Sequence, residues 1–388
     1  MNSNLKEKII KILIIVKNID GGTGTFVLNL LKINRLNIYG SQKIKVLALE
    51  HPSYRNDDYS DFNFLRPKKF YPQTYSFSIH NFINILHELI WVVRNVYKFK
   101  PNVIFGIDFR CNLLATISKL FFYQTKVVLT THIDLAFMTI NRSNRLVKEI
   151  FKLITRFFYD RADALVCVSR NLASNLKSDV DIKKNVRVIY NGMDFKTSRP
   201  KLFPKNKKVI IVSVARLSIQ KDYPTLIKAV GLLNNKYNNY ELRIASDGPE
   251  KQNLKDLVKK LGLVKRIKFL GWVKSVDTLL NKSDIFVLSS KAEGFGYVLL
   301  EAMSHGLPVV STDSPHGPSE VLENGKYGLL VPVGDEIKLC KAISILMSNK
   351  LKYEYFSKLS FRRSLYFSES KMLNAYSKLF VNLTKTRS

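Results

Sequence analysis

The 388-residue sequence has few of the features that mark secreted or membrane-embedded proteins. Its three cysteines, Cys111, Cys167 and Cys340, form no C-x-x-C pair, which argues against a zinc site or a disulfide framework and favours a reducing cytoplasm. No stretch reaches the ~18 consecutive apolar residues of a spanning helix. The first apolar run, residues 9–16, is interrupted by Lys11 and lacks a small-residue cleavage site, so it predicts a buried strand and not a signal peptide.

Acidic residues are also few. The 31 Asp and Glu residues stand against 62 Lys and Arg, and the net charge of +31 is spread over both halves of the chain. Such a charge attracts nucleic acid or an anionic membrane surface. Lysine outnumbers arginine and Asn, Ile and Tyr are abundant, as codon bias in an A+T-rich genome would also produce. No recognised nucleic-acid-binding module accompanies the charge, so we expect no nucleic-acid partner, while membrane attraction and codon bias both stay possible.

Short apolar runs alternate with helical patterns along the chain, which predicts βαβ units and parallel sheets. The predicted strands are 11–16, 44–49, 103–106, 127–131, 164–168, 187–190, 209–214, 241–245, 267–270, 285–288, 309–312 and 328–331. The predicted helices include 26–32, 82–97, 223–234, 250–261, 276–281, 297–304, 318–323 and 336–348. A polar stretch at 196–208 is a predicted linker between two α/β halves. Ligands of such sheets bind at the carboxyl ends of the strands, so we expect the chemistry in a cleft between the halves.

Residues 291–301, Lys-Ala-Glu-Gly-Phe-Gly-Tyr-Val-Leu-Leu-Glu, carry the strongest chemical signal. They follow a predicted strand and open a helix. Gly294 and Gly296 let backbone N–H groups approach a phosphate closely, and the helix N-terminus adds free donors and a positive partial charge. Glu293 and Glu301 flank this anion site, one suited to ribose hydroxyls and the other to a sugar. A surface carboxylate in the loop and a second one on the helix face would give the same pattern.

Two basic residues follow the predicted strand 209–214. They favour an anion site over the explanation that Glu293 and Glu301 are ordinary surface carboxylates. Arg216 and Lys221 lie on one loop at a carboxyl end of the sheet. An arginine can chelate two phosphate oxygens and a lysine acts as a point charge, so the pair suits a diphosphate.

The segment 209–335 resembles the donor half of glycosyltransferase family 4, whose hallmark is two glutamates separated by seven residues, here Glu293 and Glu301. Further matches are Arg216 with Lys221, 247–249 (Asp-Gly-Pro), 269–272, 301–308 and 324–332. The sequence departs from the family at Ser246, where glycine is usual before the acidic-Gly-Pro turn; this affects a turn more than the chemistry.

The resemblance implies an α/β GT-B fold, in which two Rossmann-like domains face each other across a cleft. Residues 1–198 would form the acceptor-binding domain, with a C-terminal helix at about 366–388 packing back on it. Residues 199–365 would form the nucleotide-sugar donor domain.

The resemblance also implies a role for each matched residue. Arg216 and Lys221 would neutralise the diphosphate leaving group. Glu301 would bind the ribose, and Glu293 would bind hydroxyls of the transferred sugar near its anomeric carbon. The other donor-binding residues are Gly22, Gly294, Phe295, Gly296, Trp272 and Val273. Transfer would retain the anomeric configuration, and we favour a front-face mechanism in which the leaving phosphate is the base.

The first half matches less closely. Gly21-Gly22-Thr23-Gly24 follows a predicted strand and resembles the family's first glycine-rich loop, although a structural tight turn would look the same. It is not a dinucleotide fingerprint, because the third glycine of that spacing is absent. His132 ends the predicted strand 127–131 and resembles the family's histidine that contacts the donor sugar, which makes it a candidate catalytic residue.

Two further stretches bear on partners. Asp179-Val-Asp181 could hold a metal, but its polar surroundings favour a solvated turn, so we expect no essential metal and no cofactor. Residues 141–161 predict a basic amphipathic helix with Arg145, Lys148 and Lys152 on its polar side. Such a helix suits an anionic lipid surface, or its apolar side packs on the sheet.

The arrangement Pro-x-Gly-Pro-x-Glu at 315–320 resembles a subgroup that uses UDP-N-acetylhexosamines or UDP-galactose in surface-polysaccharide assembly, such as capsule or lipopolysaccharide. We therefore expect a bacterial retaining hexosyltransferase that uses a nucleotide sugar, in particular a UDP-sugar, and a lipid-linked or oligosaccharide acceptor. It would be cytoplasmic and peripheral on the inner face of the membrane. The alternatives are a nucleotide-sugar epimerase of the same fold and, from another class, a basic nucleic-acid-binding protein.

Overall fold

The computed structural model describes residues 9–19, 21–33, 42–50, 64–65, 79–132, 145–194, 199–205, 207–234 and 236–385. The chain forms two compact units. Unit 1 comprises Met1–Tyr190 and Glu369–Ser388, and unit 2 comprises Asn191–Ser368. The structure thus assigns the residues after Tyr190 to unit 2. Parts of the predicted linker, the predicted basic helix and the predicted C-terminal helix (195–198, 141–144 and 386–388) lie outside the described residues.

Unit 1 is built on a 7-stranded parallel sheet in the order β3-β2-β1-β4-β5-β6-β7. The strands are β1 (Ile10–Val16), β2 (Gln42–Ala48), β3 (Phe64–Leu65), β4 (Val103–Ile107), β5 (Lys126–Thr131), β6 (Ala164–Cys167) and β7 (Val186–Val188). Nearly every residue of β1, β4, β5 and β6 is buried. Continuous apolar strands of this kind form because helices cover both faces of a parallel sheet.

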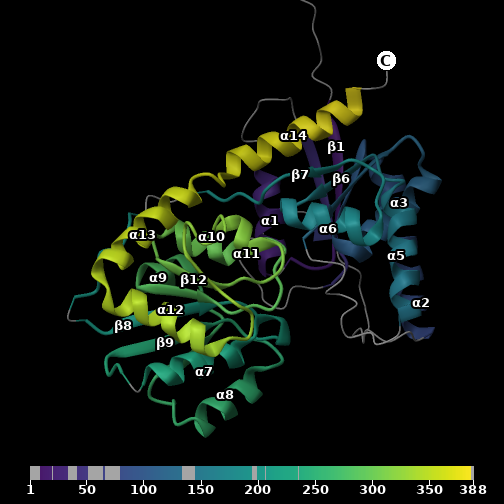
Figure 1. Ribbon diagram of the computed structural model, residues 1–388. Coiled ribbons are helices and arrows are strands. Elements are labelled where there is room, and N and C mark those ends of the chain that lie inside the picture. The colour runs from purple at the N-terminus through teal and green to yellow at the C-terminus, as the bar shows by residue number, and fades with distance from the viewer. Residues whose placement is uncertain are drawn as a thin grey trace, which may run out of the picture. The chain divides into compact units, whose positions relative to one another are not determined.

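The helices of unit 1 are α1 (Gly21–Leu31), α2 (Ile79–Phe99), α3 (Asp108–Phe121), α5 (Arg145–Tyr159), α6 (Arg170–Val180) and α14 (Glu369–Lys385). α14 closes the unit from the other end of the chain and contacts α1 and β1 (Figure 1). A salt bridge of 2.7 Å joins Lys32 Nζ to Glu369 Oε1, and Gln42 Nε2 donates to Ser377 Oγ at 2.7 Å. These contacts hold the C-terminal helix on unit 1.

Unit 2 repeats the plan with a 6-stranded parallel sheet in the order β10-β9-β8-β11-β12-β13. The strands are β8 (Val209–Val214), β9 (Tyr240–Ala245), β10 (Ile267–Gly271), β11 (Ile285–Leu288), β12 (Val309–Thr312) and β13 (Leu329–Val331). The α-helices are α7 (Tyr223–Leu233), α8 (Lys251–Lys260), α9 (Val276–Asn281), α10 (Tyr297–Ser304), α11 (Gly317–Val321), α12 (Glu336–Ser348) and α13 (Lys350–Ser364), with the 3-10 helix η3 at Ile219–Lys221. One apolar core lies between the sheet and these helices.

The predicted linker is wrong where it can be checked, because residues of that stretch pack on unit 2. Lys201 N donates to Ser357 Oγ at 2.6 Å, and Phe203 packs against the core of unit 2, with its ring 5.5 Å from that of Tyr353. The polar composition of this stretch suggested a linker, but Lys201 and Phe203 contact α13.

Three predicted strands of unit 2 (209–214, 285–288 and 309–312) and three predicted helices (276–281, 297–304 and 336–348) are confirmed to the residue. The prediction gave no residue range for β3, α3, α6 and α13. α3 is buried over much of its surface, so its sequence lacks the polar face on which a helical pattern depends. No helix in the described part of the chain is both long and apolar enough to cross a bilayer.

Candidate active site

The loops that carry the predicted donor residues meet at the carboxyl edge of the unit 2 sheet. β8, β11 and β12 are adjacent and parallel, so the loops that follow them leave the sheet at the same edge. The loop after β8 includes Arg216 and ends in η3 with Lys221; the loop after β11 contains residues 289–296. β8 has β9 on one side and β11 on the other, so this edge is also the topological switch point of the sheet.

The central contact of this edge is an ion pair between two predicted site residues. Lys221 Nζ lies 2.5 Å from Glu293 Oε1, and Ser290 Oγ donates to the same oxygen at 2.7 Å. Glu293 is 8% exposed, so its carboxylate is nearly removed from water and is held by a cation and a hydroxyl. The structure thus brings Glu293 and Lys221 together across 72 residues of sequence.

Three hydrogen bonds to backbone carbonyls hold together the two loops that carry this pair. Gln220 Nε2 donates to Ala292 O at 2.8 Å, Lys291 N donates to Gln220 O at 2.8 Å, and Ser289 Oγ donates to Lys221 O at 2.8 Å. Every one of these bonds joins the loop after β8 to the loop after β11. The charged pair is therefore preorganised by two loops fixed to each other and not only by its own attraction.

The glycine-rich turn packs against the loop after β12. Gly296 has a φ of 87°, a conformation that favours glycine, and it directly precedes α10. A Cβ on Gly317 would lie 2.7 Å from the backbone carbonyl carbon of Phe295, so the glycine of the Pro-x-Gly-Pro-x-Glu sequence is required by close backbone packing. The Phe295 ring is buried against Phe367 at 5.4 Å. Phe295 can thus offer a ligand its backbone but not its ring.

Glu301 lies in the second turn of α10, away from the ion pair. Burial, together with the nearby charge of Asp277, raises the pKa of its carboxyl to about 7. Asp277 in turn lies 3.5 Å from His305 Nε2, and His305 Nδ1 is 2.9 Å from Glu301 O. The two glutamates of the hallmark therefore occupy different surroundings, one ion-paired and the other desolvated.

The other predicted donor residues are spread along the same edge. Arg216 is exposed just beyond β8, and Gly294 is buried in the loop beside Glu293. Trp272, 44% exposed, and Val273, half-buried, follow β10, which is separated from β8 by β9. The edge thus offers an exposed guanidinium near its centre and an aromatic surface further along.

In unit 1, His132 follows β5 at the carboxyl edge of that sheet. Its backbone N donates to Asp108 Oδ1 at 3.1 Å, and its ring lies 4.6 Å from the ring of Phe26. Burial lowers the pKa of His132 to about 3, so the imidazole is neutral at physiological pH. A neutral imidazole can hydrogen-bond a sugar hydroxyl without placing a second cation at the site.

Asp108, which was not among the predicted site residues, shares this edge. It follows β4 with a φ of 67°, a conformation uncommon for residues other than glycine and one that aspartate and asparagine adopt more often than most. Burial raises its pKa to about 6, although the N–H of His132 opposes the shift. Its position directly after an apolar strand is the signal that could have identified it.

The predicted glycine-rich loop is wrong as a loop. α1 begins at Gly21, so Gly22 and Gly24 form the first turns of a helix, and Thr25 Oγ1 donates back to Gly21 O at 3.3 Å. Gly24 and Phe26 bury their side of this turn in unit 1, and that burial offsets the weak helix propensity of glycine. Gly22 itself is exposed on the first turn.

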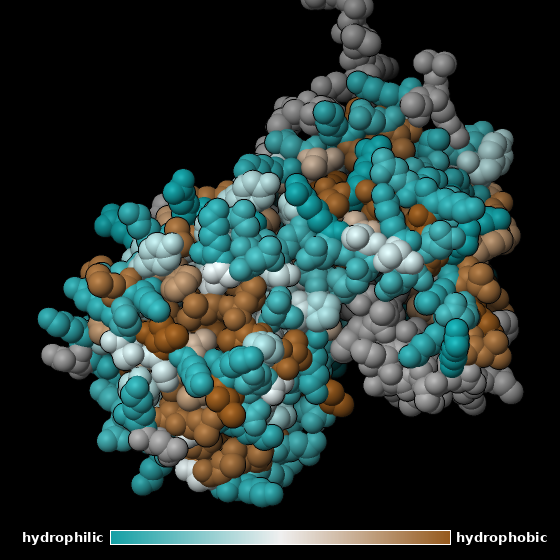
Figure 2. All heavy atoms as spheres, viewed as in Figure 1, coloured by the Kyte–Doolittle hydropathy of each residue, from teal (hydrophilic) through white to brown (hydrophobic). Residues whose placement is uncertain are grey.

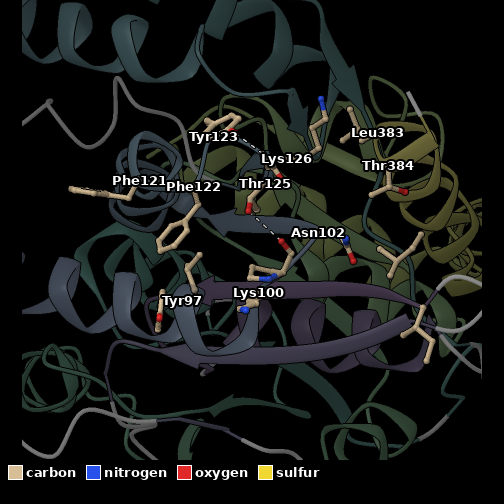
Figure 3. A pocket seen from close by; sticks show the side chains of 15 residues that line it. Tyr97, Lys100, Asn102, Phe121, Phe122, Tyr123, Thr125, Lys126, Leu383 and Thr384 are labelled. Atoms are coloured by element: carbon tan, nitrogen blue, oxygen red, sulfur yellow. Dashed lines mark hydrogen bonds between the residues drawn. The ribbon is translucent and has the colours of Figure 1, made fainter. Parts of the chain in front are cut away.

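A cavity of about 470 Å³ opens at the opposite, amino edge of the unit 1 sheet (Figure 3). Its lining includes Ile10 at the start of β1, Asn102 before β4 and Lys126 at the start of β5, together with Tyr97 and Thr384. None of the predicted site residues lines it. The two carboxyl edges, and not this cavity, carry the candidate chemistry.

The fold and the arrangement of loops define a class: two Rossmann-like α/β units in one chain, the GT-B architecture. Solved structures of this class superpose on nearly all of the chain. The structure of Anabaena HepE in complex with UDP-glucose has a TM-score of 0.75 and 18% identity, covering 95% of this chain and 99% of that one.

Sequence comparison gives the family. The model described as "Glycosyltransferase Family 4" matches residues 41–197, and that of "Glycosyl transferases group 1" matches residues 194–363. The chain belongs to glycosyltransferase family 4.

Curated relatives include the lipopolysaccharide core biosynthesis glycosyltransferase LpsE of Rhizobium meliloti, 36% identical over 204 residues, or 51% of this chain and 58% of LpsE. Another is the N-acetylgalactosamine-N,N'-diacetylbacillosaminyl-diphospho-undecaprenol 4-alpha-N-acetylgalactosaminyltransferase of Campylobacter jejuni. It is 28% identical over 259 residues, or 65% of this chain and 69% of that protein. The chain therefore spans less than two thirds of the length of LpsE.

Proposed function

We propose that this protein transfers a hexose or N-acetylhexosamine from a nucleotide sugar, in particular a UDP-sugar, to a glycan acceptor with retention of anomeric configuration. The observation that carries the proposal is the ion pair between Lys221 and the buried Glu293 at the carboxyl edge of β8 and β11, with the exposed guanidinium of Arg216 on the same loop as Lys221. This edge combines cations for a diphosphate with a carboxylate for a sugar.

The chemistry follows from where charge develops. When the bond between the anomeric carbon and the leaving phosphate oxygen breaks, that oxygen gains negative charge and the sugar gains positive charge. Arg216 and Lys221 stabilise the first, and Glu293 accepts hydrogen bonds from sugar hydroxyls beside the second. The leaving oxygen takes the proton of the acceptor hydroxyl as the new bond forms on the same face. The cations supply the charge stabilisation, so we propose no essential metal.

Glu301 is suited to the ribose, because a buried carboxyl with few competing partners accepts or donates hydrogen bonds strongly. His132 would form a neutral hydrogen bond with the transferred sugar. Trp272 and Val273 would lie near the nucleobase of the nucleotide sugar. The relative from C. jejuni is named for a diphospho-undecaprenol acceptor. We propose an acceptor of that kind here, a polyprenyl-diphosphate-linked glycan, with the protein peripheral on the inner face of the membrane.

The test is a donor panel. Purified protein is incubated with UDP-, GDP- and ADP-linked sugars and a polyprenyl-diphosphate disaccharide, and release of the nucleoside diphosphate and formation of product are both measured. We expect release with one UDP-sugar, unchanged by EDTA, and a product whose NMR coupling constants give the donor's anomeric configuration. Inversion would overturn the mechanism. Conversion of the sugar without transfer would indicate the epimerase instead.

A further inference from the structure

The helix α5 turns its apolar side away from unit 1. Its apolar residues recur at helical spacing and are strongly exposed: Leu146 66%, Ile150 46%, Leu153 64%, Ile154 40% and Phe157 52%. The residues of α5 that are buried are Thr155 and Tyr159, and Asn112 Nδ2 donates to Tyr159 OH at 2.9 Å. The expectation that the apolar side packs on the sheet is therefore wrong.

α2 has the same inverted arrangement. Ile83, Leu86, Ile90 and Tyr97 lie on one face and are 43%, 46%, 42% and 68% exposed. The opposite face, which is buried, carries Val92 and Val96 together with three polar residues, Asn84, Glu88 and Asn95. Glu88 is fully buried and lies 2.6 Å from Arg110 Nη2 on α3. A helix that buries a carboxylate and exposes isoleucine is not arranged for contact with water alone.

The two inverted helices lie in one layer. α3 packs against α2 on one side and α5 on the other, and the ring of Phe109 in α3 lies 4.4 Å from that of Phe151 in α5. Figure 2 shows hydrophobic residues gathered on the side of unit 1 where α2 and α5 lie. Exposed apolar residues thus lie on both flanks of α3 and form one face of unit 1.

Cations border this face. On α5, Arg145 and Lys148 form no ion pair with a carboxylate of the described chain, and Arg161 follows the last exposed phenylalanine, with its guanidinium 3.5 Å from the centre of the Phe157 ring. On α2, Arg94 and Lys98 follow the apolar stripe and are exposed. Apolar side chains at the centre with basic residues around them complement a surface that is apolar inside and anionic at its boundary.

We propose that the outward faces of α2 and α5 form a membrane-docking surface that inserts into the headgroup region of an anionic bilayer. This assigns a surface to the peripheral location proposed above, and it goes beyond net charge because it requires the apolar residues as well as the cations. Binding by charge alone would need none of the five apolar residues of α5. A second copy of the chain would need no anionic lipid.

The experiment measures sedimentation of the full chain with vesicles of phosphatidylglycerol and phosphatidylcholine at 30:70, and with phosphatidylcholine alone. The triple variant I150S/L153S/F157S removes exposed apolar groups without touching the core. We expect at least tenfold weaker binding to anionic vesicles for it and for the α2 variant I83S/L86S/I90S, and little binding of any form to pure phosphatidylcholine. Equal binding of both variants and the parent would overturn the proposal.

The control is a charge-matched pair. R145E/K148E changes the formal charge by as much as K255E/K259E on α8, whose lysines are also exposed. We expect a tenfold or larger loss for the first and less than twofold for the second. Equal losses of vesicle binding in the two charge variants would show that net charge alone drives binding, and would overturn the proposal. Salt-independent self-association of the parent that the serine variants abolish would also overturn it. UDP binding by the serine variants, measured without lipid, should stay unchanged, so a failure of the donor site is seen separately.

Discussion

The carboxyl edges of the two sheets have the same topology but carry different charges. In unit 2, Glu293 is held by Lys221 at 2.5 Å, with Arg216 exposed nearby. In unit 1, burial keeps His132 neutral and raises the pKa of Asp108 to about 6. The same Rossmann-like frame thus supports one edge with cations suited to a diphosphate and another edge with a neutral imidazole suited to hydroxyl groups. Fold alone sets where side chains emerge, and the loops decide what charge they carry.

The largest effect is expected at the centre of the charged edge. Glu293→Gln keeps the size of the side chain and its contact with Ser290 but removes the charge. We expect turnover to fall by roughly two to three orders of magnitude, because the amide stabilises developing positive charge poorly. Initial rates with saturating donor measure this, and an unchanged melting temperature shows that the fold is intact. Activity within threefold of the parent would remove Glu293 from the reaction.

The next effect concerns the cation of the same pair. Lys221→Met should weaken UDP binding by about tenfold or more, because a charged hydrogen bond contributes about 1.5–3 kcal/mol. It also leaves Glu293 buried without its cation, which should lower stability. The double variant K221M/E293Q should recover stability but not UDP affinity. Titration calorimetry checks this, with the exposed Lys228→Met as control; equal affinity for Lys221→Met and Lys228→Met would contradict a diphosphate site here.

A smaller effect is expected at His132, on the carboxyl edge of the unit 1 sheet. His132→Ala should reduce turnover about three- to tenfold, the size of one neutral hydrogen bond. Since the pKa of His132 is lowered to about 3, its titration cannot shape the rate between pH 5 and 8. The parent and His132→Gln should therefore give pH–rate profiles of the same shape. A change in rate near pH 6.5 that is present in the parent and absent in His132→Gln would show that the imidazole of His132 is protonated there. It would contradict a neutral His132 at the carboxyl edge of the unit 1 sheet.

The smallest effect is on stability and its pH dependence at Glu301. Because the folded-state pKa is raised from 4.5 to about 7, the folded protein holds this proton where the unfolded chain has lost it. The free energy of unfolding should therefore fall as pH rises from about 4.5 to 7, by roughly 1–3 kcal/mol from this group. In Glu301→Gln that fall should be absent. Urea unfolding at pH 5 and pH 7.5 measures it, and identical slopes for both proteins would show that Glu301 is not desolvated.

At Ser246 the sequence departs from the family, and the structure shows what this departure does to the backbone. The family usually has glycine there, and the structure gives Ser246 a φ of 118°, a conformation that glycine adopts without strain. Its N–H donates to Gly271 O at 2.7 Å, which joins the residue after β9 to the last residue of β10. The departure could be read from the sequence, whereas the strain it causes could be seen only in the backbone.

Two basic amphipathic helices mark the limit of sequence patterns. α8 buries Leu254 and Val258 and exposes its lysines, as its periodicity predicts. α5 has an equally regular apolar stripe but exposes it. The helical periodicity of apolar residues shows which face of a helix is apolar. Whether that face is buried depends on how the helix packs against the neighbouring core. The buried residues of α5 are Thr155 and Tyr159, and Phe151 packs on Phe109 of α3.

The sequence by itself determined the parallel α/β plan, the strands and helices that carry the loops, and most of the candidate donor residues, because period-2 and period-3.6 patterns and glycine–carboxylate spacing are local properties. Tertiary structure alone decided that Lys221 pairs with Glu293, that Asp108 lies beside His132, that the glycine tract 21–24 is helical and that α2 and α5 expose their apolar sides. Each of these depends on groups distant in sequence sharing one desolvated site, and burial and electrostatics act through space and not along the chain.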